Sequence, residues 1–301
     1  MKKIKLITIK QDTQLFMIIG LFLFSLFVSA SEEVIKPTQN SQSLEPDTTQ
    51  QAMLYFKTYA ESDQDQALIK ILEDTQFFNR VKKIIETNFI LSTPLHVHIQ
   101  HQQESKFVTT KLNQPSHIIT IPFSFIHTLY QGLLNKYEHQ SEIINIIFSA
   151  SIEFYIWSEF SAYLIKDKHL EVMGDKLTAT DNFSSIMMLN QNNPSSDYIA
   201  DASEAYLLIR SSDTSSVGQH NKSELQQDQQ RYRHIICLSF GFDQLTQLPE
   251  SDKYHLQSFT WDEKKIQQCK QNYRDILSNW YQAISPYLTT NNLITHWLNQ
   301  R

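Results

Sequence analysis

The stretch from Ile143 to Ile165 constrains this chain most, because it reads as a long helix with almost no polar side. Its apolar residues recur at helical spacing and occupy nearly every face of the helix. A helix that is apolar all round is buried, so the remaining segments must pack around this one. Two acids, Glu153 and Glu159, lie inside the stretch. A buried carboxylate is costly unless it is paired or protonated.

The rest of the chain predicts an α+β fold that is mostly helical. Residues Leu95 to Ile99 alternate between apolar and histidine side chains, which is typical of a strand. Further short strands are expected at Phe107–Leu112 and His117–Ile121. We therefore expect a small antiparallel sheet over residues 95–121, beside the apolar helix. Helical spacing recurs over the segments 64–89, 123–137, 141–166, 176–191, 197–211, 223–241 and 262–284.

Residues 1–30 have the features of a signal peptide. A basic start is followed by an apolar run from Leu15 to Val28 and by the small residues Ser29 and Ala30. The run has about 14 residues, fewer than the ~20 that span a membrane. We expect a cleaved signal, with a retained anchor as the alternative. Residues 31–50 are polar and predict a disordered linker, and residues 51–301 form the domain. The mature protein would be periplasmic or secreted, with no stable membrane span.

Composition narrows the classes of function. The net charge is −6 and no basic cluster follows the leader, which argues against a nucleic-acid partner. Only five glycines occur, so no glycine-rich phosphate-binding loop is expected. The two cysteines, Cys237 and Cys269, favour a disulfide in an oxidising compartment, and two buried free thiols are the alternative.

Ser158-Glu159-Phe160-Ser161-Ala162 has the spacing of a His-Glu-x-x-His helix in which only the Glu remains, and Val172-Met173-Gly174 follows it as a turn. Further short motifs contain Ala179, Asp181, Asp228-Gln229-Gln230-Arg231-Tyr232, Cys237, Gly241, Cys269, Tyr273 and Trp280. In their order and spacing these residues resemble a family of bacterial proteins classed as zinc metallopeptidases of the His-Glu-x-x-His, gluzincin-like type.

The resemblance implies a zincin-like domain and places the family's zinc ligands at Ser158, Ala162 and Leu177. Catalytic zinc needs three protein ligands and one open position. Serine is a poor zinc ligand, and alanine and leucine are not ligands at all. The chain therefore resembles a degenerate member of the family, for which we expect no zinc and no other cofactor. Glu159 matches the general base and would be a relic of it.

The resemblance also assigns supporting residues. Asp181 matches an acid that would orient a zinc-bound histidine in active relatives. Arg231 could pair with that acid or with Glu159, as an ion pair that stabilises the fold. Cys237 and Cys269 fall where the family also has cysteines, which adds to the case for the disulfide.

Three hypotheses for function follow. The first is a catalytically inactive metallopeptidase homologue that binds a protein or peptide partner or acts as a scaffold. The second is an active hydrolase with an atypical site, and the third is a structural protein of the cell envelope. Candidate residues for the second hypothesis are Glu153, Glu159, Asp181, His169 and His234.

Three histidines lie close together in the predicted strand region. His96 and His98 share one face of the strand, and His101 follows. Because histidines two positions apart lack a third convergent ligand, we expect a solvated strand face rather than a metal site.

Overall fold

The computed structural model describes residues 53–101, 117–138, 140–191, 198–212, 222–242, 261–290 and 292–295. The expected signal peptide and linker lie outside these residues. The mostly helical α+β class is confirmed, and the predicted helices from residue 123 onward are present to within two residues. The described elements are β1 (Leu54–Thr58), α1 (Asp63–Asp74), α2 (Phe77–Asn88), β2 (Leu95–Gln100), β3 (His117–Pro122), α3 (Phe123–Lys136), α4 (Ser141–Asp167), α5 (Lys176–Leu189), α7 (Ile199–Ser212), α8 (Lys222–Gly241), α10 (Glu263–Ile284) and the 3₁₀ turn η2 (Ser285–Tyr287).

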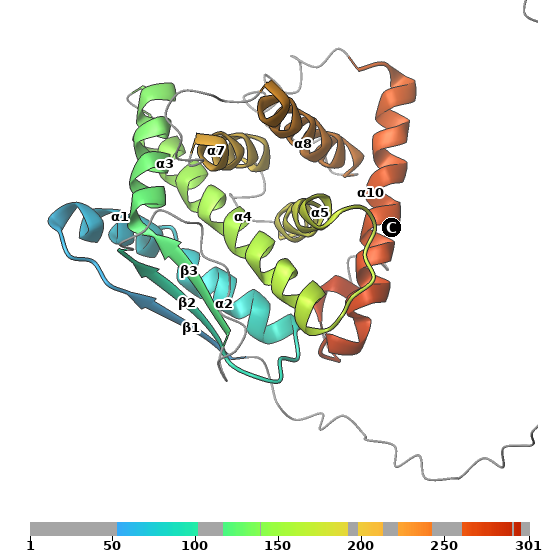
Figure 1. Ribbon diagram of the computed structural model, residues 1–301, viewed down its shortest axis with the longest axis horizontal. Helices are drawn as coiled ribbons and strands as arrows, with labels where there is room; N and C mark the ends of the chain where they lie inside the picture. Colours follow the sequence, from blue (N-terminus) through green and yellow to red (C-terminus); the bar gives the residue numbers. More distant parts are fainter. Residues whose placement is uncertain are drawn as a thin grey trace, which may run out of the picture. The chain divides into compact units, whose positions relative to one another are not determined.

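The sheet has three parallel strands in the order β1-β2-β3 (Figure 1). Leu54 pairs with Leu95, and Leu95 pairs in turn with His117. The prediction of an antiparallel sheet was therefore wrong. Alternation of side chains reveals a strand and its buried face, but it is the same for both strand directions. Direction follows from the connection, and α1 and α2 form the long crossover that the parallel neighbours β1 and β2 require.

Other differences are local. Strand β1 adds to the predicted elements, and the helix expected over residues 64–89 is two helices, α1 and α2. The chain turns between them at Gln76, whose φ is +56°, and the hydroxyl of Thr75 donates to the carbonyl oxygen of Leu72 at 3.1 Å. The strand expected at Phe107–Leu112 lies outside the described residues.

Helix α4 forms the centre of the core, as its composition predicts. It contacts α1, α2, α3, α5, α7 and β3. Figure 1 shows the sheet on one flank of α4 and α5, α8 and α10 on the other. Among the described residues, α4 is the helix long and apolar enough to cross a membrane, yet most of it is buried inside the domain. Its apolar surface is therefore accounted for by packing within the protein.

The buried acid in the middle of α4 is paired with an arginine from α2. Glu153 is 0% exposed, and its Oε2 accepts hydrogen bonds from Nε (3.1 Å) and Nη2 (2.8 Å) of Arg80. The indole Nε1 of Trp157 donates to the other oxygen at 3.3 Å. The pair satisfies the carboxylate that the sequence places inside an apolar helix, and it fixes α2 against α4.

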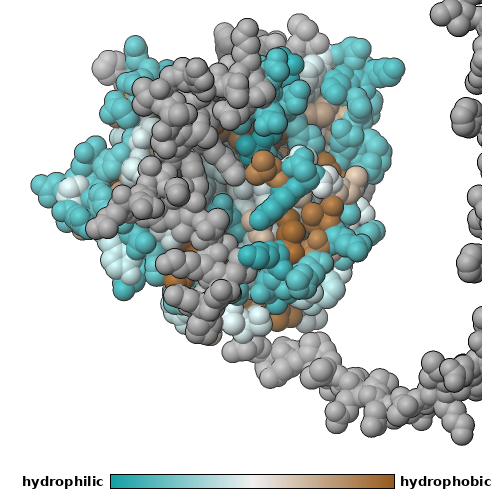
Figure 2. All heavy atoms as spheres, viewed as in Figure 1, coloured by the Kyte–Doolittle hydropathy of each residue, from teal (hydrophilic) through white to brown (hydrophobic). Residues whose placement is uncertain are grey.

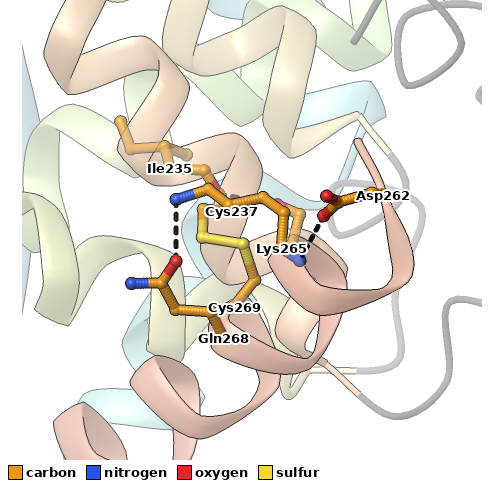
Figure 3. The surroundings of a disulfide bond; sticks show 7 residues. Ile235, Cys237, Asp262, Lys265, Gln268 and Cys269 are labelled. Atoms are coloured by element: carbon orange, nitrogen blue, oxygen red, sulfur yellow. Dashed lines mark hydrogen bonds between the residues drawn. A yellow bond between two sulfur atoms is a disulfide. The ribbon is translucent and has the colours of Figure 1, made fainter. Parts of the chain in front are cut away.

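A disulfide joins α8 to α10 (Figure 3). The Cα atoms of Cys237 and Cys269 are 5.0 Å apart, and the predicted bridge is confirmed. Gly241, one turn after Cys237, allows the two helices to approach closely. A Cβ at this position would lie 2.3 Å from the carbonyl oxygen of Cys269 and 2.7 Å from the Cβ of Tyr273.

We expect Gly241→Ala to destabilise the protein by about 1–3 kcal/mol, because the new methyl group must push α10 away from α8. Gly132→Ala in α3 is the matched control. Nothing lies within 4 Å of a Cβ at Gly132, so the replacement should instead stabilise the helix by about 1 kcal/mol. Denaturant unfolding of both variants under non-reducing conditions measures the difference. Equal changes in stability for the two substitutions would contradict the close approach of α8 and α10 at Gly241.

Candidate functional site

The positions that align with the family's zinc ligands lie in the second half of α4 and at the start of α5. Ser158 and Ala162 are four residues apart in α4 and therefore share one face of the helix. Ser158 is buried, with 3% of its surface exposed, and Ala162 is half-buried. Glu159, the residue in the position of the general base, is also half-buried. The acid is thus retained in a partly accessible place, beside two side chains that zinc does not use.

The turn before α5 brings the third position to the surface. Gly174 has a φ of +85°, in the left-handed region that favours glycine. Asp175 then caps α5, and its carboxylate accepts hydrogen bonds from the backbone N (3.0 Å) and Oγ1 (2.8 Å) of Thr178. Leu177 follows in the first turn and is 45% exposed, and Met173 is 52% exposed. Figure 2 shows apolar surface over α5 and the segment before it.

The two supporting residues assigned by the resemblance pair with each other. Asp181 on α5 is 1% exposed, and Arg231 on α8 donates to its two oxygens from Nε (2.7 Å) and Nη2 (2.8 Å). Burial would lower the pKa of the Arg231 guanidinium, but the hydrogen bonds and charge of Asp181 outweigh it and raise that pKa. Such a two-point contact is both strong and directional. It joins α5 to α8 one helical turn after Leu177.

Two of the other candidates for a hydrolase site, Glu153 and His234, have partners of their own. Glu153 is bound by Arg80, as described above. The Nε2 of His234 on α8 lies 2.5 Å from Oδ1 of Asn182, and burial lowers the pKa of this histidine despite the nearby charge of Asp181. His169 lies in an exposed position just after α4, with a φ of +50°. The hydrogen bonds of Glu153, Asp181 and His234 therefore serve packing between helices.

A cluster that sequence reasoning missed gathers around Asp65, at the start of α1. Asp65 is 0% exposed, and its Oδ1 lies 2.7 Å from Nε2 of His127. Its Oδ2 lies 2.8 Å from Nε2 of His101 and accepts from the backbone N of Glu61 (3.1 Å) and Ser62 (3.0 Å). Ser62 and Asp65 form a capping box. The Ser-x-x-Asp spacing could have revealed the cap, but no sequence signal joins the two histidines to it.

We expect Asp65→Asn to destabilise the protein by about 3 kcal/mol at neutral pH, because an amide cannot accept from all four donors. Burial would raise the pKa of Asp65, but hydrogen bonds from His101, His127 and Ser62 hold it well below 3.8. The stabilisation is complete above the unfolded-state pKa and is lost as the pH falls towards the folded-state pKa.

The stability difference between Asp65→Asn and wild type should therefore be largest at neutral pH and shrink below pH 3.8. Urea unfolding at a series of pH values measures it. Asp63→Asn is the control, because Asp63 is an exposed acid in the same helical turn. If Asp65→Asn lowers the free energy of unfolding no more than Asp63→Asn does, the buried carboxylate does not stabilise the fold as described.

We also expect the ion pair between Asp181 and Arg231 to stabilise the fold. Arg231→Met leaves a buried carboxylate without its partner and should cost about 3–5 kcal/mol. The double variant Asp181→Leu, Arg231→Met should cost less than Arg231→Met alone, since no charge is then left buried. Arg233→Met, at an exposed position of the same helix, is the control. A thermal-unfolding comparison that ranks the double variant as the least stable would contradict this account.

The donor set does not fit the zinc that the resemblance implies. The side chains at the three ligand positions are a hydroxymethyl, a methyl and an isobutyl group, and none of them is an imidazole, thiolate or carboxylate. Within the described part of the chain, no three His, Cys, Asp or Glu side chains are placed to hold a metal ion. In the Asp65 cluster, the two imidazoles approach different oxygens of the acid.

Comparison with protein families agrees with the metallopeptidase resemblance that the sequence motifs indicate. A family model described as "Putative metallopeptidase" matches residues 57–284, which includes every described element from α1 to α10. No curated protein and no solved structure matches the chain. The match covers most of the sequence, so the chain belongs to this metallopeptidase family.

Proposed function

We propose that this protein is an exported, catalytically inactive member of its metallopeptidase family, with a binding or scaffold role. The observation that carries the proposal is the set of residues at the family's ligand positions, Ser158, Ala162 and Leu177. Without three ligands no zinc is held to lower the pKa of a water molecule or to polarise a peptide carbonyl. Glu159 then has no activated water from which to take a proton.

A hollow beside the same region supports a binding role. It measures about 380 Å³ and lies between the turn before α5 and the last part of α10. Its walls combine apolar and polar groups, as small binding sites do. The exposed side chains of Met173 and Leu177 continue the apolar surface beyond it, and methionine adapts readily to different partners. The lining residues are Glu171, Val172, Met173, Asn279, Gln282 and Ala283.

Two features support export. Residues 1–30 combine basic, apolar and small-residue segments in the order of a signal peptide. The disulfide between Cys237 and Cys269 is the kind of bond that persists outside the reducing cytosol. A protein or peptide on the outer side of the membrane is therefore the class of partner that we propose.

The decisive experiment measures zinc and peptide hydrolysis together. We expect the wild-type protein to hydrolyse no peptide and to hold no zinc at the family position. We expect the triple variant Ser158→His, Ala162→His, Leu177→Glu to bind one zinc ion after dialysis, and each single variant to bind none there. Hydrolysis need not return, because Lys176 and Thr178 stand where the family has acidic neighbours.

Ser158 is buried, so a histidine at this position could prevent the triple variant from folding. In that case the zinc content and peptide hydrolysis of the wild type alone test the proposal. Zinc-dependent peptide hydrolysis by the wild type that is lost in Glu159→Gln would overturn the proposal. Hydrolysis that survives Glu159→Gln but disappears on repeated purification comes from a contaminating peptidase. Hydrolysis that survives both would also overturn the proposal, because it would indicate an atypical site elsewhere in the protein.

A further inference from the structure

The outer face of the sheet carries a row of aromatic and basic side chains. Tyr55 pairs in register with His96, and Lys57 with His98. Tyr55 is 45% exposed and Tyr59 is 36% exposed, so this face is open to solvent where β1 and β2 run side by side. Parallel sheets are usually covered on both faces. An open face with this composition therefore needs an explanation other than packing.

His96 and His98 lie together on this face. Two positions apart on one strand, they project to the same side, and their ring centroids are 6.0 Å apart. Tyr55 stacks on His96 with centroids at 5.2 Å, and Tyr59 meets His98 edge-on at 5.7 Å. Strand β2 is hydrogen-bonded on both sides, by β1 and by β3. The two imidazoles are thus held by a rigid backbone and by a tyrosine each.

Among the described residues, no hydrogen bond joins the ring nitrogens of this pair to a protein group. His101 and His127, in contrast, each direct Nε2 at Asp65. Within the described residues, neither His96 nor His98 hydrogen-bonds to another side chain, and their contacts are with rings. Neutral imidazole nitrogens are strong ligands for divalent transition metals.

The sequence alone led us to expect a solvated strand face here, because a third convergent ligand is lacking. From the geometry we instead propose that His96 and His98 form a two-histidine site for a divalent transition-metal ion, Cu²⁺ above all, with water in the remaining positions. Affinity for nitrogen ligands rises to Cu²⁺ along the first-row series and falls again at Zn²⁺. With metal–nitrogen bonds of ~2.0–2.1 Å, the ring centroids must approach from 6.0 Å to roughly 5 Å. Small rotations of the two side chains achieve this. The site lies on the sheet, whereas the family's zinc position lies on α4 and α5.

Lys57 sets the strength of the site. It is the register partner of His98 on the neighbouring strand, and its Nζ lies 4.7 Å from the centre of the Tyr59 ring, on the same face. A cation in this place repels a metal ion. Because neighbouring strands are ~4.8 Å apart, a glutamate here would instead offer a carboxylate oxygen as a third donor. Lys57→Glu should therefore tighten binding.

The test is calorimetric titration with Cu²⁺ of the full chain purified without an oligohistidine tag. We expect one Cu²⁺ per chain, and binding weakened at least about tenfold in His96→Gln and in His98→Gln, since loss of even an outer partner of a ligand costs about 10- to 100-fold. His169→Asn is the control, because His169 is exposed, lies after α4 and has a positive φ that asparagine tolerates.

Equal binding by the wild type and both histidine variants, or no stoichiometric binding, would overturn the site. If circular dichroism shows that a variant is unfolded, the electron paramagnetic resonance spectrum of the Cu²⁺-loaded wild type tests the site instead. Coupling to two imidazole nitrogens supports the proposal, and coupling to none refutes it. His96 and His98 lie on the sheet, whereas the family's zinc position lies on α4 and α5. Loss of copper binding in the two histidine variants therefore separates this site from that position, and the two proposals stand or fall independently.

Discussion

The need to enclose α4 on all sides organises this domain. A helix with so few polar side chains must be covered, and the sheet with α1, α2 and α3 covers one part of it while α5 and α7 cover another. The deeply buried acid of α4, Glu153, is stabilised by its ion pair with Arg80. Because Arg80 belongs to α2, the ion pair also fastens the β1-α1-α2-β2 unit to the central helix.

A second ion pair stabilises the region to which the motif resemblance assigns the family's zinc site. Asp181 and Arg231 both match the family motifs, and they bind each other across α5 and α8. That contact requires no metal. In the proposed inactive protein, Ser158, Ala162 and Leu177 hold no zinc, and the contact between Asp181 and Arg231 stabilises the packing of α5 against α8 without it. What persists at the surface is the retained acid Glu159 and an apolar area around Leu177.

Sequence patterns predicted the features that depend on one segment at a time. Helical spacing located α3, α4, α5, α7, α8 and α10, because each buries a continuous apolar face. The disulfide followed from compartment and family position. Strand direction did not follow, because alternation is the same in both directions. The cluster of Asp65, His101 and His127 escaped because its members come from three elements far apart in the chain.

The crossover between β1 and β2 has a consequence for the order in which the chain can fold. An N-terminal fragment that ends before Leu95 contains β1, α1 and α2 but no partner strand. It cannot satisfy the backbone groups of β1 in a sheet, and it lacks α4, against which α1 and α2 pack in the folded protein. Pairings between distant segments form slowly. A chain synthesised from its N-terminus therefore stays without this sheet until β2 is available, and the unpaired edge of β1 is exposed to other chains until then.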